Sequence, residues 1–246
     1  MSVNNIFFDC DIAEMENKAE KEYYNVLENK TVSFLGDSYF AGNGLDKSLV
    51  WPYMLASKYN MNYGNYGMNG SPISNYVTTI SPMVDRYMSM ADNSPDIVIV
   101  EGGRNDFCQR VPLGEDGSLD TKTFKGAIRY LLTKLKDKYP NAVIIGVTIW
   151  DYYTEEENQQ NYKLGYSWTC SEYGKAFIKV CEDTGTPYID AMDKIAIGVD
   201  VTDATFRQKY CMAVDDRSHL NAEGMKKVLP IFEKRIAEIY AASKGN

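Results

Sequence analysis

The chain has 246 residues, 44% of them hydrophobic and 24% charged, and its formal net charge is −8 at pH 7. This length accommodates one well-buried domain and is short for two. The negative charge disfavours nucleic acid as a partner, because an acidic surface repels phosphate backbones.

The start of the chain is charged, and its periodicity predicts an outer helix over residues 12–28. We therefore expect residues 1–29 to form an N-terminal extension of one domain over residues 30–246. The sequence shows no basic and apolar signal peptide, and no apolar run in it is long enough to span a bilayer. A cytoplasmic location is the default expectation, and a secreted one if the sequence was trimmed.

Five cysteines are scattered along the chain without a C-x-x-C pair. An odd number in this arrangement disfavours both a disulfide framework and a structural zinc site. We expect reduced thiols that serve as small apolar residues.

The first predicted strand, over residues 31–35, is followed directly by Gly36, Asp37 and Ser38. A serine just after a strand of a parallel sheet lies at the ligand-binding edge, where its own N–H can face a developing oxyanion. The same tripeptide is also typical of an ordinary turn with local hydrogen bonds. A helical pattern over residues 49–59 follows.

The second predicted strand, over residues 62–66, is diluted by asparagine and glycine. Gly67 and Gly70 follow it, and a glycine lets the backbone approach a ligand and offer a bare N–H. Taken alone, these glycines are better explained by an ordinary strand-to-helix turn. The next helical pattern covers residues 73–90.

The third predicted strand, over residues 96–100, leads into Gly103, Arg104, Asn105 and Asp106. The Asn105 side chain at a strand end can donate an N–H to the same oxyanion. A polar turn that caps its own backbone is the alternative. The remaining pattern consists of helices over residues 121–139, 167–184 and 221–242, strands over residues 142–149 and 187–190, and two long loops over residues 107–120 and 151–166.

Strands that read as continuous apolar runs suit a parallel sheet covered on both faces. Alternating strands and helices predict an α/β protein, with a three-layer α/β/α sandwich around a sheet of about five strands. Pro230 lies inside the last helical pattern, where a proline kinks or restarts a helix.

His219, the single histidine of the chain, precedes the last predicted helix. Asp216 lies three residues earlier, so one loop can carry both side chains, and the carboxylate can fix the tautomer and orientation of the imidazole. Asp215 is a rival for this role, although the spacing favours Asp216. The alternative is a loop that only caps the helix.

Taken together, G-D-S at residues 36–38, G-x-N-D at 103–106 and D-x-x-H at 216–219 resemble the SGNH (GDSL) hydrolase family. The resemblance runs from about residue 31 to the final helix, and it implies a flavodoxin-like central sheet, the SGNH hydrolase fold. It implies that Ser38 is the nucleophile, His219 the general base and Asp216 the residue that orients the base. No G-x-S-x-G elbow of the other large hydrolase group occurs.

The resemblance also implies an oxyanion hole formed by the Ser38 N–H, the Gly70 N–H and the Asn105 side chain. In the family this glycine lies about five residues after an asparagine at the end of the second strand, and the resemblance therefore selects Gly70 over Gly67. No metal or organic cofactor is expected.

The implied function is hydrolysis of an acyl ester, with a small-molecule or carbohydrate substrate such as a short-chain or acetyl ester. A thioesterase or lysophospholipase-type acyl hydrolase is the nearest alternative. A non-catalytic flavodoxin-like domain is another, in which the loop over residues 36–44 would hold an anion at a helix N-terminus. The sequence predicts neither a membrane span nor an oligomeric state.

Overall fold

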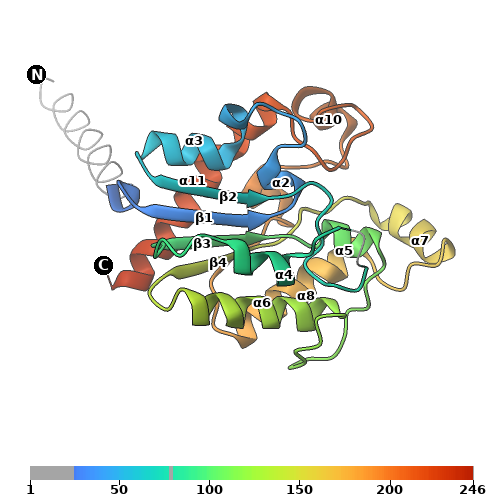
Figure 1. The fold of residues 1–246 in the computed structure, drawn as a ribbon. Helices are drawn as coiled ribbons and strands as arrows, with labels where there is room; N and C mark the ends of the chain where they lie inside the picture. The colour runs from blue at the N-terminus through green and yellow to red at the C-terminus, as the bar shows by residue number, and fades with distance from the viewer. Residues whose placement is uncertain (1–24, 78–79, 246) are drawn as a thin grey trace, which may run out of the picture.

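The computed structural model describes residues 25–77 and 80–245, and its centre is a five-stranded sheet in the order β2-β1-β3-β4-β5 (Figure 1). Every strand pair is parallel. The strands are β1 Thr31–Gly36, β2 Asn62–Gly67, β3 Ile97–Glu101, β4 Val143–Val147 and β5 Tyr188–Ile189. The predicted α/β fold with a parallel sheet is confirmed.

Helices cover both faces of the sheet (Figure 1). On one face α3 lies beside α11, where the rings of Trp51 and Phe232 stack at 4.4 Å. On the other face α6 lies between α4 and α8, and Phe124 contacts Tyr173 at 4.9 Å. The helices are η1 Asn25–Leu27, α2 Ser38–Ala41, η2 Lys47–Leu49, α3 Trp51–Lys58, α4 Met83–Arg86, η3 Tyr87–Ser89, α5 Arg104–Cys108, α6 Phe124–Lys138, α7 Glu155–Lys163, α8 Cys170–Asp183, α9 Lys194–Ile197, α10 Ala204–Tyr210 and α11 Ala222–Lys244.

The position of each strand in the sheet explains how clearly its sequence predicted it. β3 and β4 are buried along their whole length, so they consist of apolar runs. β2 lies at the edge of the sheet and none of its residues is fully buried, which allows asparagine and glycine in it. Gly36 pairs with Gly67 and Leu35 pairs with Val100, so the carboxyl ends of β1, β2 and β3 lie side by side. The segments that follow these three strands therefore leave the sheet close to one another.

The helix predicted over residues 73–90 is wrong for most of its length. Only α4 and the short η3 form there, and the described residues between Gly70 and α4 are irregular. One physical cause is Pro82, which lies inside the predicted helix and has no backbone N–H to donate. The N–H groups of Ile73 and Ser74 bond to the buried Asp106 carboxylate, which attaches this irregular segment to α5.

The predicted loop over residues 151–166 contains a helix, α7, which is a correction. Thr154 and Glu157 form a capping box at its start, a signal present in the sequence. Two more short helices, α9 and α10, begin after the capping residues Asp193 and Asp203 and were not predicted. Pro230 lies inside α11, which continues through it.

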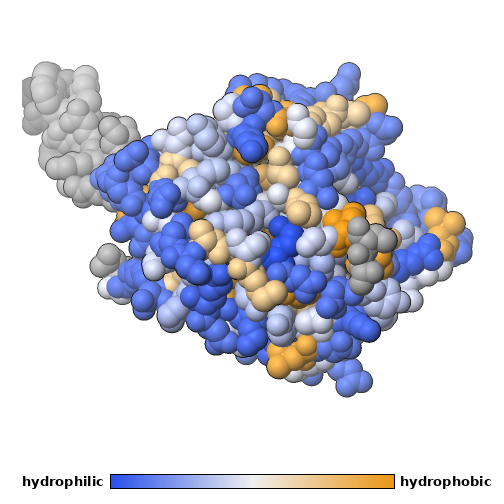
Figure 2. All heavy atoms as spheres, viewed as in Figure 1, coloured by the Kyte–Doolittle hydropathy of each residue, from blue (hydrophilic) through white to orange (hydrophobic). Residues whose placement is uncertain are grey.

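The predicted outer helix over residues 12–28 lies mostly outside the described residues, and the division at residues 29 and 30 stays a prediction. Within residues 25–77 and 80–245, no helix is long and apolar enough to cross a membrane. Figure 2 shows mostly hydrophilic residues on the viewed face, with apolar ones in small groups between them.

Candidate active site

The side chains of Ser38, His219 and Asp216 are joined by hydrogen bonds near the carboxyl ends of the strands. The His219 Nε2 atom lies 3.0 Å from Ser38 Oγ, and His219 Nδ1 lies 3.0 Å from Asp216 Oδ2. Ser38 is 7% exposed. The structure therefore brings together the three residues that the sequence predicted to act as a unit.

Local hydrogen bonds explain why Ser38 lies there. β1 ends at Gly36, and Asp37 caps the following helix because its Oδ1 accepts the Tyr39 N–H at 3.0 Å. Ser38 is the first residue of α2, so its own N–H has no partner within the helix. Gly42 ends this short helix with a φ of 84°.

The Asp216 carboxylate shapes the loop that carries His219. Its Oδ1 accepts the backbone N–H of Ser218 at 2.7 Å and that of His219 at 3.0 Å, while Oδ2 faces the imidazole. The neighbouring Asp215 is exposed. The structure therefore places Asp216, and not its rival, against the ring.

A second set of contacts holds this loop against residues 150–157. Arg217 donates to the Tyr152 carbonyl at 2.9 Å and forms a two-pronged ion pair with Glu157 at 2.8 and 2.7 Å. Arg104, stacked 4.1 Å above the Tyr152 ring, donates through Nε to Ser218 Oγ at 3.2 Å. Sequence reasoning did not predict these contacts, because Arg217 and Glu157 lie far apart in the chain.

The ion pair predicts an acid-sensitive contribution to stability. The Arg217 hydrogen bond lowers the pKa of Glu157 from its ordinary 4.5 to about 2. Because the pKa of Glu157 is lower in the folded state than in the unfolded state, its ion pair stabilises the fold above about pH 4.5. This contribution is lost as the pH falls towards 2. We expect the unfolding temperature of Glu157→Gln to fall less than that of the wild type across this window.

The control for this prediction is Glu156→Gln, which changes an exposed acid on the same helix. Thermal unfolding followed by circular dichroism measures all three proteins. Parallel curves for wild type and Glu157→Gln between pH 4.5 and pH 2 would contradict the assignment.

Asn105 lies at the start of α5, beside Ser38's own segment. Its Nδ2 donates to Asp37 Oδ2 at 2.9 Å and to the Ser71 carbonyl at 3.1 Å. The neighbouring Asp106 is fully buried and accepts the Ile73 and Ser74 N–H groups, both at 2.9 Å. The G-x-N-D motif therefore contacts both the loop after β1 and the loop after β2, a role for Asp106 that sequence reasoning did not assign.

The two candidate glycines after β2 differ in their backbone. The Gly67 N–H is bonded to Asn65 Oδ1 at 2.8 Å, so it is occupied. Gly70 has a φ of 76°, and a Cβ atom there would come 3.0 Å from Ile80 Cδ1, so the position favours glycine. Within the described part of the chain, the Gly70 N–H has no hydrogen-bond partner.

Three buried carboxyl groups lie beneath the site. Burial raises the pKa of Asp37 to about 7 and that of Asp106 to about 6. Burial and the charge of Asp37 raise the pKa of Glu101 well above its ordinary value. Asp37 accepts hydrogen bonds from the Tyr39 N–H and the Asn105 side chain.

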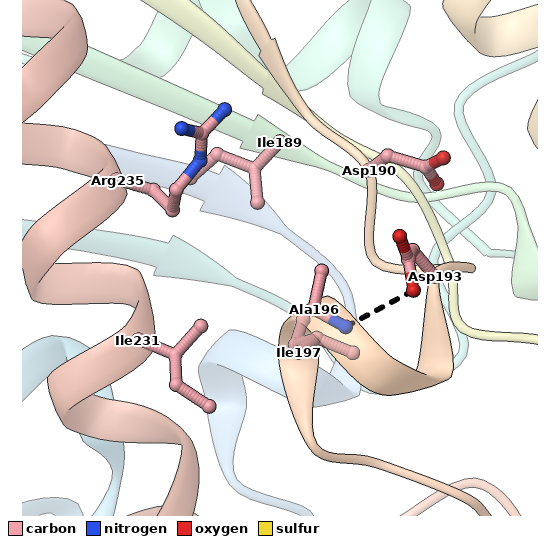
Figure 3. A pocket seen from close by; sticks show the side chains of 7 residues that line it. All are labelled: Ile189, Asp190, Asp193, Ala196, Ile197, Ile231 and Arg235. Atoms are coloured by element: carbon pink, nitrogen blue, oxygen red, sulfur yellow. Dashed lines mark hydrogen bonds between the residues drawn. The ribbon is translucent and has the colours of Figure 1, made fainter.

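A cavity of about 280 Å³ lies elsewhere, between β5, α9 and α11 (Figure 3). Asp193 caps α9 at its rim by accepting the Ala196 N–H at 3.0 Å. None of its lining residues belongs to the predicted site. The described residues contain no group of three or more histidine, cysteine, aspartate or glutamate side chains arranged to hold a metal ion.

Comparison with known proteins gives one family and a set of similar folds. The model of the GDSL-like lipase/acylhydrolase family matches residues 34–227. None of the curated proteins compared with the chain matches its sequence.

Among solved structures, a protein from Lactobacillus plantarum has a TM-score of 0.70 at 24% identity, covering 88% of this chain and 98% of that one. The psychrotrophic esterase EstA from Pseudoalteromonas sp. has a TM-score of 0.60 at 18% identity, covering 85% and 97%. A carbohydrate esterase family 2 enzyme from Corynascus thermopiles has a TM-score of 0.55 at 16% identity, covering 88% and 67%. At these identities the likeness concerns the fold.

Proposed function

The chain belongs to the GDSL-like lipase/acylhydrolase family and is a hydrolase acting on ester bonds, and from this we propose that Ser38, His219 and Asp216 are its catalytic triad. The contact of 3.0 Å between His219 Nε2 and Ser38 Oγ carries this proposal. A histidine nitrogen at hydrogen-bond distance from a serine hydroxyl is the arrangement that makes a weak nucleophile reactive.

In the proposed reaction, Ser38 Oγ attacks the ester carbonyl carbon while His219 Nε2 takes the hydroxyl proton. Asp216 accepts a hydrogen bond from the Nδ1–H of His219, which leaves Nε2 free to act as the base and stabilises the imidazolium that forms. The alcohol leaves with the proton from Nε2. Water then attacks the acyl-enzyme with His219 again as the base, and the carboxylic acid is released.

The negative charge on the former carbonyl oxygen requires nearby donors. The Ser38 N–H at the start of α2 and the unoccupied Gly70 N–H suit this role. Both Asn105 N–H groups already have acceptors, so its participation requires the bond to the Ser71 carbonyl to pass to the substrate oxygen.

The proposed substrate is a short-chain or carbohydrate acyl ester. Ser218, the residue before His219, accepts a hydrogen bond from Arg104, and polar side chains at this position suit a short or polar ester better than a long alkyl chain. The carbohydrate esterase with a similar fold and the tyrosine-rich segment over residues 151–166 agree with a sugar ester. The nearest alternative is a thioesterase or lysophospholipase-type acyl hydrolase.

A series of p-nitrophenyl esters from acetate to palmitate tests this substrate class. We expect kcat/KM to be highest for acetate and to fall as the acyl chain lengthens, because the polar groups of Arg104 and Ser218 favour a short or polar acyl group. An acetylated oligosaccharide, assayed for released acetate, tests the sugar. A maximum at long acyl chains would replace the short-chain proposal with the lysophospholipase-type alternative.

A further inference from the structure

Arg86, the last residue of α4, belongs to none of the sequence motifs, yet its side chain makes several hydrogen bonds near the site. Its Nη1 donates to the Tyr66 carbonyl at 2.5 Å, and its Nε donates to the Ser81 carbonyl at 3.2 Å. Its Nη2 donates to the Gly36 carbonyl and to Ser71 Oγ, both at 2.9 Å. One half-buried guanidinium therefore joins three segments that are distant in the sequence.

The acceptors of Arg86 adjoin the proposed oxyanion donors. Gly36 ends β1, two residues before Ser38. Ser71 follows Gly70 directly, and its carbonyl accepts the Asn105 side chain. Arg86 thus contacts the chain next to all three donors, although it touches none of them.

The turn that contains Gly70 has few regular hydrogen bonds of its own, so its position depends on such contacts. The N–H groups of Met83 and Val84 bond to the carbonyls of Pro72 and Ile73, which attaches the turn to α4. Asp106 holds the same turn from the side of α5 through Ile73. Neither attachment reaches the end of β1. Among the side-chain hydrogen bonds of the described residues, only the one from Arg86 links the end of β1 to α4.

We propose that Arg86 is a positioning residue for ester hydrolysis, which holds the ends of β1 and β2 and the Gly70 turn so that the three donors face one substrate oxygen. This inference rests on the proposed oxyanion hole. Arginine suits the task because its planar fork has five N–H donors, whereas lysine has one flexible ammonium. Donors stabilise a developing charge best when they are held in place before the reaction, and a displacement of about 1 Å can cost on the order of 10²-fold in rate.

The test is Arg86→Ala, assayed with p-nitrophenyl acetate. We expect kcat to fall about 10²-fold, the effect of losing one oxyanion donor, while KM changes little. Millimolar guanidinium chloride should restore part of kcat by filling the vacated site, and methylammonium chloride should not. Arg129→Ala is the matched control, because it removes a helical arginine that pairs with Asp183 at 2.9 Å on the surface of α6 and α8.

Ser71→Ala gives a milder variant in case Arg86→Ala fails to fold. It removes one acceptor of Arg86 and the Ser71 bond to the Ser81 carbonyl, and it leaves the three carbonyl bonds of Arg86, so we expect a smaller loss of kcat in a folded protein. A folded Arg86→Ala with wild-type kcat would overturn the inference, as would a loss that guanidinium does not restore. If Arg86→Ala does not fold, an unchanged kcat in Ser71→Ala would overturn it.

The rate at which a fluorophosphonate labels Ser38 separates this inference from the proposed function. A wild-type protein that is not labelled would refute the proposed triad. Labelling of the wild type and of Arg86→Ala at equal rates would refute only the positioning role of Arg86.

Discussion

Replacing Ser38 with alanine is expected to lower kcat for p-nitrophenyl acetate by on the order of 10⁴-fold or more, because the atom that attacks the ester is removed. The only side-chain bond that Ser38 forms among the described residues is the one to His219, so the free energy of unfolding should change by about 1 kcal/mol or less. Steady-state kinetics and thermal unfolding of the same preparations measure the two effects.

Ser57→Ala is the control for this variant, since Ser57 lies exposed on α3 and makes no side-chain hydrogen bond in the described structure. We expect wild-type kinetics from it. A folded Ser38→Ala that keeps a substantial part of the wild-type kcat would contradict the assignment of Ser38 as nucleophile.

Replacing Asp216 with asparagine is expected to lower kcat by about 10⁴-fold, although the side chain keeps its shape. The asparagine oxygen can still accept the Ser218 and His219 N–H groups, which turns its NH₂ group towards the imidazole. Nδ1 must then accept a hydrogen bond from this NH₂ group instead of donating one, so the neutral ring carries its proton on Nε2. In that tautomer Nε2 cannot take the proton of Ser38.

Asp215→Asn provides a close control, because it makes the same chemical change at an exposed neighbouring residue. We expect its kcat and its pH profile to match those of the wild type. Equal losses in the two variants would show that the loop responds to its net charge and would contradict the tautomer explanation.

The sequence predicted the sheet and the proximity of Ser38 and Asn105 for related physical reasons. β3 and β4 are buried on both faces, which requires the apolar runs that identify them. The carboxyl ends of parallel strands meet at one edge, so Ser38 after β1 and Asn105 after β3 had to lie near each other. His219 joins them from the loop before α11, a placement that came from the family resemblance and not from periodicity.

The parts that could not be predicted depend on contacts between distant residues. The pattern over residues 73–90 favours a helix, but Pro82 interrupts it, and Asp106, which is distant in the sequence, holds the backbone of Ile73 and Ser74. The choice between Gly67 and Gly70 depends on the Asn65 side chain, which occupies the Gly67 N–H. Arg86 looks like any polar residue of a helix until the fold brings the two strand ends to it.

The most direct test of the triad is covalent labelling with a fluorophosphonate, with the modified residue identified by mass spectrometry. We predict one adduct, on Ser38, in the wild type, much slower labelling in His219→Ala and none at this position in Ser38→Ala. An adduct on another residue, or none on the folded wild-type protein, would contradict the assignment of Ser38 as the activated nucleophile.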